Sequence, residues 1–495
     1  MLSCVLQPQT GRQQGRMIDE KKLEERLTAL EAAKVWSPRV VSRLETLLRS
    51  ADETALFRIN PIRFATDKGI ADSEAIDLFL HGTLVGLFEM DWLLLCPMCS
   101  DVVESLHSLQ KLHSHYHCHL CQGDYEAVLD DYIAVTFTVS PAVRRISYHD
   151  PDALAVDDYA FIYKVTSQGM TPEGVPWVEV IRSCIRALSW LEPGATVELE
   201  VDAVEGVLLS FDMESDAHFN FIVAGDAASA PQRVPITFGV NTCTPDAGSI
   251  APGKVVFEVH NATVDRRAVF GVLQLPPGGV PPHGMLQFQP FLSGKRLLMT
   301  QTFRDFFRSE VIRGTEGLAV RDITVLFTDL KGSTALYERI GDLNAYVQVQ
   351  RHFEQLVDVT VRHQGAVTKT IGDAVMAAFL TPADAVQAAL EMRQSVEQMN
   401  RDRPQRDFIL KIGVHTGPSI AVTLNERLDY FGQTVNIASR VQHLADGDEI
   451  VITDNVRQST GIAEILAPYR IDKSAAELKG ISGSVPVYFV RGFAA

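Results

Sequence analysis

The sequence has no uninterrupted apolar run as long as the roughly 18–20 residues that a membrane-spanning helix needs. Its richest apolar stretch, Leu84–Cys96, is interrupted by Glu89 and Asp91. The first residues, Met1-Leu-Ser-Cys-Val-Leu, are too short for the core of a signal peptide, and no basic segment precedes them. We therefore expect a cytoplasmic protein that does not contact a membrane.

Positive charge is also scarce. The chain has 45 Lys and Arg but 62 Asp and Glu, which gives a net charge of −17. Segments Pro61–Lys68 and Ser73–Leu84 are predicted to be helices, and with the apolar run ending at Leu95 they resemble a winged helix. The second of these helices begins Ser-Glu-Ala-Ile-Asp-Leu-Phe-Leu-His and has no Arg or Lys. Phosphate contacts dominate DNA affinity. We therefore expect no nucleic-acid partner, and a packing or regulatory role for this region.

With 495 residues, of which 46% are hydrophobic and 22% charged, the chain is predicted to form several globular domains. Residues 1–20 lack periodicity and are predicted to be a disordered tail. Residues 21–129 are predicted to form a helical, winged-helix-like region. Within it, Lys21–Leu48 has a helical pattern that is broken at Trp36-Ser-Pro.

Four of the seven cysteines form two Cys-x-x-Cys pairs separated by eighteen residues. This spacing predicts a structural zinc ribbon over 96–121, in which four thiolates leave no open position on Zn²⁺. A histidine of the intervening segment could replace one thiolate, and four free thiols or a redox dithiol are the alternatives. The predicted ligands are Cys96, Cys99, Cys118 and Cys121, and the histidines are His107, His113, His115 and His117.

Residues 130–292 change to period-two patterns with Gly and Pro between them, which predicts a β-rich, sandwich-like domain. No catalytic constellation is visible there, so we expect a regulatory role with an unknown ligand or partner. Residues 293–318 are predicted to be a linker containing one helix, Leu297–Gly314. This helix either couples the N-terminal modules to a dimer interface or is a packed linker helix. The predicted strands include Tyr132–Val139, Thr196–Val201, Gly206–Phe211, Phe219–Ala224 and Lys254–Val264.

The strongest motif begins at Ile323, where an apolar strand ends in Asp329 and a turn of Gly332, Ser333 and Thr334 opens a helix. Free N–H groups at such a turn are suited to phosphate. About forty residues later, two short apolar strands, Ala366–Ile371 and Ala374–Phe379, are joined by Gly372-Asp373, a tight hairpin signal. Paired side by side, these strands would bring Asp329 and Asp373 together as ligands for two divalent cations, Mg²⁺ or Mn²⁺.

Residues of about 320–490 resemble the class III nucleotide cyclase catalytic domain, the adenylate and guanylate cyclase family. The resemblance implies an α+β, ferredoxin-like domain over 319–495, and it covers roughly a third of the chain. The order of zinc ribbon, β-rich region and cyclase also resembles that of soluble bacterial cyclases. The matching segments are Phe327-Thr-Asp-Leu-x-Gly-Ser-Thr, Lys369-Thr-Ile-Gly-Asp, Lys411-Ile-Gly-Val-His-Thr-Gly and Asp429-Tyr-Phe-Gly-Gln-Thr-Val-Asn-Ile-Ala-Ser-Arg.

By this resemblance, Lys369 and Asp429 read the purine, Asn436 orients the ribose and Arg440 stabilises charge on the α-phosphate. Lys479 is placed near the terminal phosphates. Lys and Asp match the N1 acceptor and 6-amino donor of adenine, whereas the guanylate branch usually has Glu and a small residue such as Cys. The resemblance therefore implies an adenylate cyclase that acts on ATP.

In the family the site is shared across a head-to-tail dimer, and this chain has both halves, so we expect a homodimer with two equivalent sites. The alternatives are a guanylate cyclase and a non-catalytic nucleotide-sensing regulator.

Overall fold

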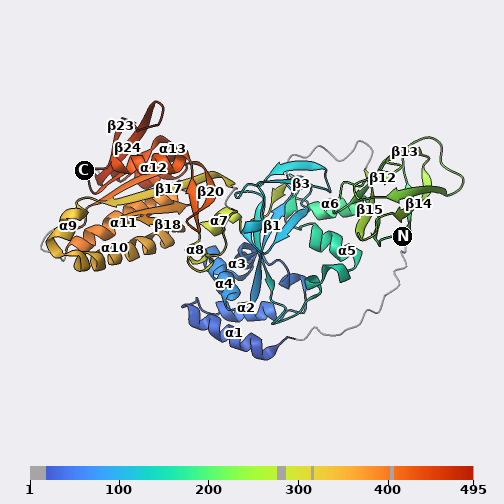
Figure 1. The fold of residues 1–495 in the computed structure, drawn as a ribbon, viewed down its shortest axis with the longest axis horizontal. Helices are drawn as coiled ribbons and strands as arrows, with labels where there is room; N and C mark the ends of the chain where they lie inside the picture. Colours follow the sequence, from blue (N-terminus) through green and yellow to red (C-terminus); the bar gives the residue numbers. More distant parts are fainter. Residues whose placement is uncertain (1–17, 276–285, 314–316, 402–405, 494–495) are drawn as a thin grey trace.

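The computed structural model describes residues 18–275, 286–313, 317–401 and 406–493. Three parts follow one another along the longest axis (Figure 1): the C-terminal α/β part, a central region built mostly from the N-terminal third, and a β-sandwich. No helix in the described ranges is long and apolar enough to cross a membrane. The predicted disordered tail lies almost entirely outside the described residues.

The N-terminal helices confirm the predicted helical segments. They are α1 Glu20–Ala33, α2 Val40–Leu48, α3 Pro61–Lys68 and α4 Asp72–Leu84. Asn60 caps α3 by accepting a hydrogen bond from the N–H of Ile62 at 3.0 Å, and Pro61 occupies the first turn, where no N–H is needed. Their apolar faces pack on a three-stranded sheet with the order β2-β1-β5. Its strands are β1 Phe88–Leu95, β2 Val102–Leu106 and β5 Ile133–Val139.

The β-rich domain predicted for 130–292 is a sandwich only from residue 185 to residue 275. Strand β5, the predicted Tyr132–Val139, instead pairs with β1 of the N-terminal sheet over seven residues, and all of its side chains are buried. The segment after it is largely helical, with α5 Val156–Asp158, a π-helical turn η5 Tyr159–Lys164 and α6 Trp177–Cys184. Because β5 is buried on both faces, its sequence lacks the alternation of polar and apolar residues that would have distinguished it from the sandwich strands.

The sandwich consists of a five-stranded sheet, β13-β10-β9-β15-β7, and a four-stranded sheet, β12-β11-β14-β8. Aromatic side chains fill the space between them, and the ring of Phe219 stacks on that of Phe257 at 4.8 Å. The strands are β7 Ile185–Leu191, β8 Thr196–Ala203, β9 Gly206–Asp212, β10 Asn220–Val223, β11 Gln232–Phe238, β12 Cys243–Thr244, β13 Ala247–Ile250, β14 Gly253–Asn261 and β15 Ala268–Leu275.

The prediction of a single linker helix over Leu297–Gly314 is wrong. The structure has two short helices, α7 Gly294–Leu298 and α8 Gln301–Phe306, separated by Met299 and Thr300. Leu297, Leu298 and Met299 are all buried. Three consecutive residues cannot share one face of a helix, so the chain turns to bury them all.

The C-terminal part has the predicted ferredoxin-like core. Its sheet has the order β18-β19-β17-β20-β22-β24-β23, and β21 pairs with β20. If β17, β18, β19 and β20 are numbered 1 to 4 along the chain, their order in the sheet is 2-3-1-4, as in a βαββαβ unit. The elements are β17 Leu318–Leu330, α9 Ser333–Ile340, α10 Asp342–Arg362, β18 Gly365–Ile371, β19 Ala374–Phe379, α11 Pro382–Arg401, β20 Leu410–Leu424, β21 Arg427–Phe431, α12 Gln433–His443, β22 Glu449–Thr453, α13 Asp454–Arg457, α14 Ile462–Leu466, β23 Tyr469–Glu477 and β24 Ser484–Phe493.

The central strand β17 is buried on both faces. Leu326 and Leu330 pack into the core formed with α10 and α11. Ile323, Val325 and Phe327, on the other face, belong to the same core as the N-terminal helices, β1, β5 and α8. The N-terminal region therefore packs directly on the cyclase sheet.

Helix α10 buries a histidine whose protonation would oppose folding. His352 is fully buried, stacks on Phe408 at 5.4 Å, and neither ring nitrogen has a hydrogen-bond partner among the described residues. Burial lowers the pKa of His352 to about 4. Below pH ~6.5 the unfolded chain gains a proton that the folded chain does not bind, so stability falls between about pH 6.5 and pH 4.

We predict that His352→Leu removes this loss. The unfolding free energy of the variant minus that of the wild type should be about 2 kcal/mol larger at pH 5 than at pH 7.5. Urea unfolding at the two pH values measures this. His443→Gln, at an exposed position of α12, is the control. An equal difference between His352→Leu and wild type at both pH values would contradict the prediction.

Candidate functional site

Strand pairing brings the two predicted metal carboxylates to one end of the sheet. Thr328 pairs with Val375, and its hydroxyl accepts a hydrogen bond from the N–H of Val375 at 3.2 Å. Asp329 therefore ends β17 beside the predicted tight hairpin, in which Ile371 pairs with Ala374. Asp373, in the hairpin loop, has a buried Oδ2 with no hydrogen-bond partner in the described part of the chain. An unpartnered carboxylate oxygen at this place fits a divalent cation.

The predicted phosphate turn directly follows Asp329. Gly332 precedes α9 with φ 79°, a left-handed conformation that favours glycine, and no side chain caps the helix. The first N–H groups of α9, including those of Ser333 and Thr334, have no partner within the helix. The turn thus offers backbone donors next to the carboxylates.

Lys369 and Asp429 form an ion pair, although sixty residues separate them. Nζ of Lys369 lies 2.5 Å from Oδ2 of Asp429, and the side chains are 35% and 8% exposed. The other carboxylate oxygen, Oδ1, accepts a hydrogen bond from the N–H of Tyr430 at 2.8 Å. Strand β18 supplies the lysine and β21 the aspartate. The pairing brings one cationic donor and one fixed acceptor to the same place, where a single planar base can contact both.

Helix α12 carries the predicted ribose and α-phosphate residues. It lies close to β20 because Gly413 has no side chain: a Cβ there would lie 2.2 Å from the backbone nitrogen of Gln442. Asn436 is exposed, and Arg440, one turn later, is partly buried with Nη1 lacking a hydrogen-bond partner within the described ranges. The Arg440 guanidinium faces Gly480, directly after the exposed Lys479.

The site residues thus form two sets in one chain. The metal carboxylates and the phosphate turn lie at the end of β17, and Arg440 lies beside the turn that carries Lys479. Among the described residues, no hydrogen bond or ion pair joins Asp329 or Asp373 to Asn436 or Arg440.

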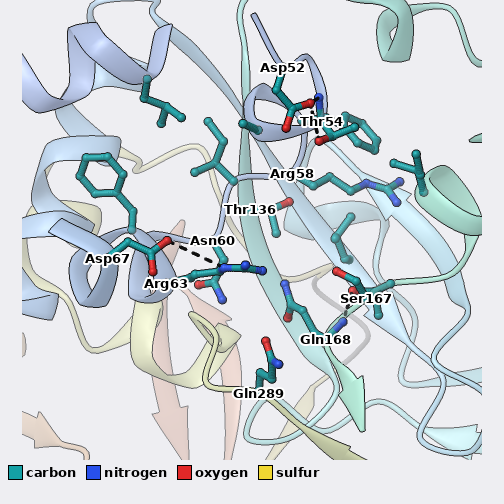
Figure 2. Close-up of a pocket in the computed structure, with 18 of the residues that line it drawn as sticks. Asp52, Thr54, Arg58, Asn60, Arg63, Asp67, Thr136, Ser167, Gln168 and Gln289 are labelled. Atoms are coloured by element: carbon teal, nitrogen blue, oxygen red, sulfur yellow. Dashed lines mark hydrogen bonds and ion pairs between the residues drawn. The ribbon is translucent and has the colours of Figure 1, made fainter. Parts of the chain in front are cut away.

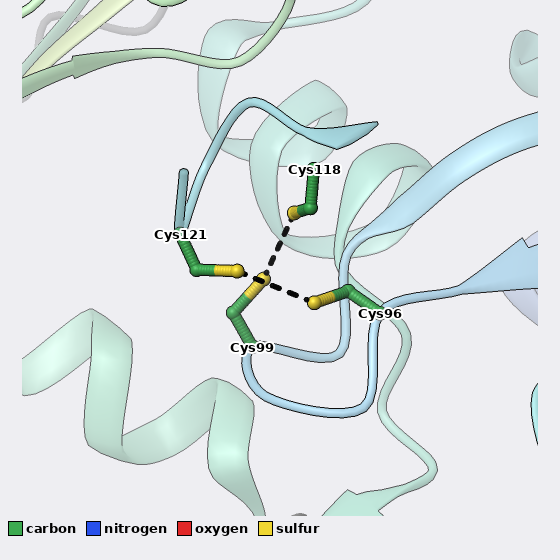
Figure 3. A group of neighbouring side chains, drawn as sticks. All are labelled: Cys96, Cys99, Cys118 and Cys121. Carbon is green, nitrogen blue, oxygen red and sulfur yellow. Dashed lines mark hydrogen bonds between the residues drawn. The ribbon is translucent and has the colours of Figure 1, made fainter. Parts of the chain in front are cut away.

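The four cysteines of the predicted zinc ribbon converge, as Figure 3 shows. Their sulfur atoms all lie within 4.8 Å of one another, with Cys96 and Cys121 at 3.4 Å and Cys99 and Cys118 at 3.5 Å. A tetrahedral Zn²⁺ with four sulfurs at about 2.3 Å needs sulfur–sulfur distances of about 3.8 Å. Burial raises the pKa of the Cys99 thiol, so its thiolate requires a cation close by. The residues fit zinc.

None of the histidines between the pairs replaces a thiolate. His107 forms an ion pair with Asp91. His117 lies against Asp124 and Asp216 instead.

The sequence did not predict a contact between the linker and the strands that carry Lys369 and Asp429. The guanidinium of Arg304 on α8 donates to the carbonyl oxygen of Leu428 at 3.0 Å and lies over the ring of Tyr430 at 5.4 Å. The side chain of Gln301 accepts a hydrogen bond from the N–H of Val367 at 2.8 Å. The helix therefore holds both strands that carry Lys369 and Asp429. A helical pattern in the sequence shows that α8 is amphipathic, but not which strands it contacts.

A cavity of about 530 Å³ lies in the N-terminal region, beside α3 and β5 (Figure 2). The rings of Phe57 and Tyr163 stack on each other at 5.7 Å, and the Arg58 guanidinium lies beside this stack, 4.8 Å from each centroid. Arg58 Nε, Thr136 Oγ1 and Gln168 Oε1 are buried with no hydrogen-bond partner among the described residues. The cavity has the size of a small-molecule site.

Two family models match the chain. Residues 20–305, more than half of the chain, match a family of unknown function (DUF5939), and residues 318–492 match the adenylate and guanylate cyclase catalytic domain.

Several curated adenylate cyclases match the C-terminal part. One from Rhizobium meliloti, named putative adenylate cyclase 3, is 32% identical over 29% of this chain and 24% of its own length. The adenylate cyclase of Anabaena cylindrica is 28% identical over 35% of this chain and 37% of its own length. The pH-sensitive adenylate cyclase MT1302 of Mycobacterium tuberculosis is 28% identical over 42% and 49%. The chain thus spans about a quarter to a half of the length of these relatives.

Solved structures match over the same part. The adenylyl cyclase CyaB from P. aeruginosa is 21% identical, with a TM-score of 0.32, over 36% of this chain and 97% of that chain. The guanylate cyclase domain of RhGC from Catenaria anguillulae, in complex with GTP, is also 21% identical, with a TM-score of 0.31, over 36% and 99%. The chain belongs to the family of unknown function (DUF5939), and its C-terminal part is an adenylate and guanylate cyclase catalytic domain.

Proposed function

We propose that this protein is an adenylate cyclase that converts ATP to 3′,5′-cyclic AMP and pyrophosphate. The observation that supports this choice of substrate is the ion pair between Lys369 and Asp429. Adenine presents an acceptor at N1 and a donor at the 6-amino group, which match an ammonium and a carboxylate. Guanine presents a donor at N1 and an acceptor at position 6, so both contacts would be mismatched. An unmet polar contact in a buried site costs about 1–3 kcal/mol.

In the reaction, the ribose 3′-oxygen loses its proton and attacks the α-phosphorus, and the bond from that phosphorus to the pyrophosphate oxygen breaks. Asp329 and Asp373 would hold two Mg²⁺ or Mn²⁺, which lower the pKa of the hydroxyl and neutralise the triphosphate. The N–H groups after Gly332 bind phosphate oxygens. Asn436 orients the ribose, Arg440 stabilises the negative charge that develops on the α-phosphate, and Lys479 contacts the terminal phosphates.

We further propose that two copies of the chain share each site, one supplying the carboxylates and the other Asn436 and Arg440. Exposed apolar side chains on the site-bearing elements support a homodimer. Ile371, beside the Gly372-Asp373 loop, is 53% exposed, and Phe431, two residues after Asp429, is 61% exposed. Apolar side chains exposed at such loops are expected where another chain covers them.

The thiol cluster has a separate, structural role in this proposal. Four sulfurs around Zn²⁺ leave no position for water or substrate, so the metal stabilises the ribbon and takes no part in cyclisation.

We predict that Lys369→Glu combined with Asp429→Cys shifts the preference from ATP towards GTP. With about 1–3 kcal/mol for each contact, the ATP:GTP ratio of kcat/KM should fall at least about tenfold. The ratio is insensitive to the fraction of active protein, so partial unfolding cannot produce the shift. An unchanged ratio would show that these residues do not read the base.

We predict that Asp329→Asn and Asn436→Ala each lower cyclic AMP formation about 100-fold or more, because several kcal/mol of transition-state stabilisation is lost. Mixed under conditions that exchange subunits, the two variants should recover about a quarter of wild-type activity. About half of the dimers are then mixed, and each mixed dimer has one intact site.

Asp322→Asn, at an exposed position on the same strand as Asp329, is the matched control and should keep its activity. A pull-down with two different tags confirms that subunits exchange. Mixed dimers without recovered activity would refute the shared site, and wild-type turnover by Asp329→Asn would refute its role as a metal ligand.

We predict that the chain retains one equivalent of zinc during purification and that Cys99→Ser loses it. Because structural zinc contributes directly to folding free energy, the N-terminal unfolding midpoint should fall by about 5 °C or more. Cys184→Ser, at a free cysteine outside the cluster, should retain the zinc. Metal analysis by mass spectrometry provides the count. Zinc-free wild-type protein, or Cys99→Ser with full zinc content, would contradict the assignment.

A further inference from the structure

We propose that His117, His119 and Asp216 form a second metal site, for a divalent transition-metal cation, where the zinc ribbon meets the β-sandwich. Their ligand atoms all lie within 4.8 Å of one another. His117 Nε2 lies 3.0 Å and His119 Nδ1 2.8 Å from the same oxygen, Oδ1 of Asp216. Ligands around a four-coordinate cation at about 2.0–2.1 Å lie about 3.3 Å apart, so a cation needs an expansion of only a few tenths of an ångström.

The alternation of the ribbon strand aims His117 away from the thiol cluster, and the turn after Cys118 brings His119 to the same aspartate, Asp216. Strand β3, His115–Cys118, pairs with β4, Gly123–Glu126. Cys118 is buried among the thiols, and the histidines on either side of it in the sequence are partly exposed and face the sandwich. Neighbouring residues of an extended chain point in opposite directions. One short segment therefore contributes to two different clusters.

The two ring nitrogens of His117 face different carboxylates. Its Nδ1 lies 2.9 Å from the Asp124 carboxylate, and its Nε2 faces Asp216. With a metal at Nε2, the N–H on Nδ1 donates to Asp124. This carboxylate–histidine–metal arrangement is the usual way in which a second carboxylate orients a metal-binding histidine.

The sandwich holds the third ligand in place. Asp216 lies in the loop between β9 and β10, where the Ser215 hydroxyl donates to the buried carboxylate of Asp212 at 2.7 Å. Arg266 also binds Asp212, from the far side of the loop. The loop is thus fixed before any metal binds, and the cation would join segments that are almost a hundred residues apart in the sequence.

Two imidazoles and one carboxylate select the class of metal. Imidazole suits Zn²⁺, Fe²⁺, Co²⁺ and Ni²⁺, whereas Mg²⁺ and Ca²⁺ prefer oxygen ligands alone. The side chains of His117, His119 and Asp216 are 33%, 38% and 40% exposed, so solvent reaches the site. We therefore infer an exchangeable cation with at least one position open to water, in contrast to the buried thiol site.

The test is a titration of the full-length chain with Co²⁺ after its retained zinc has been counted, in an excess of Mg²⁺ that occupies the carboxylates Asp329 and Asp373. The wild type should bind one further equivalent, seen by calorimetry, without the sulfur-to-cobalt charge-transfer band of a thiolate site. Asp216→Asn and His119→Gln should each weaken this binding at least about tenfold. His218→Gln, an exposed histidine in the same loop as Asp216, is the matched control and should bind as the wild type does.

The retained zinc reports whether the ribbon of each variant is folded, and the readout does not depend on cyclase activity. If the wild type binds no further equivalent of Co²⁺, the proposal is wrong. It is also wrong if folded Asp216→Asn binds Co²⁺ with wild-type affinity.

Discussion

The structure depends on the apolar core on one face of the cyclase sheet, which the N-terminal region shares with α12. Ile323, Val325 and Phe327 of β17 belong to the core that includes the N-terminal helices, α8 and Ala438 of α12, and α10 and α11 cover the opposite face. A shift of β17 by one residue would exchange its side chains between these two differently packed cores. The position of Asp329 at the end of β17 is therefore fixed by both parts of the chain.

The linker connects this packing to the strands that carry the ion pair between Lys369 and Asp429. Through Gln301 and Arg304, α8 bonds to the backbones of β18 and β21, one or two residues away from Lys369 and Asp429. Backbone groups buried at such a contact are costly to leave unpaired. A rearrangement of the N-terminal region that moves α8 must therefore act on both strands together.

Local patterns made much of the cyclase domain predictable. The Gly372-Asp373 hairpin and the strand with Asp329 near its end follow from apolar periodicity and turn residues, whereas Asn436 and Arg440 were identified through the family resemblance. Longer-range features were not predictable in this way. Strand β5 was grouped with the sandwich because a fully buried strand carries no alternation, and Asp216 approaches His119 only through the tertiary fold. The break between α7 and α8 was missed because it arises from burying three adjacent side chains.

The ion pair between Lys369 and Asp429 lies between two contacts of different kinds. On β18, Lys369 is two residues from Val367, which bonds to α8, and two from the exposed Ile371. On β21, Asp429 likewise lies between Leu428, which bonds to Arg304, and the exposed Phe431. A residue of a strand spans about 3.3 Å, so the α8 contact and the exposed side chains of Ile371 and Phe431 are about 10–13 Å apart. A second copy of the chain that covers Ile371 and Phe431 therefore need not displace α8. Under the proposed function, N-terminal packing and dimerisation would act on Lys369 and Asp429 from opposite ends of the same two strands.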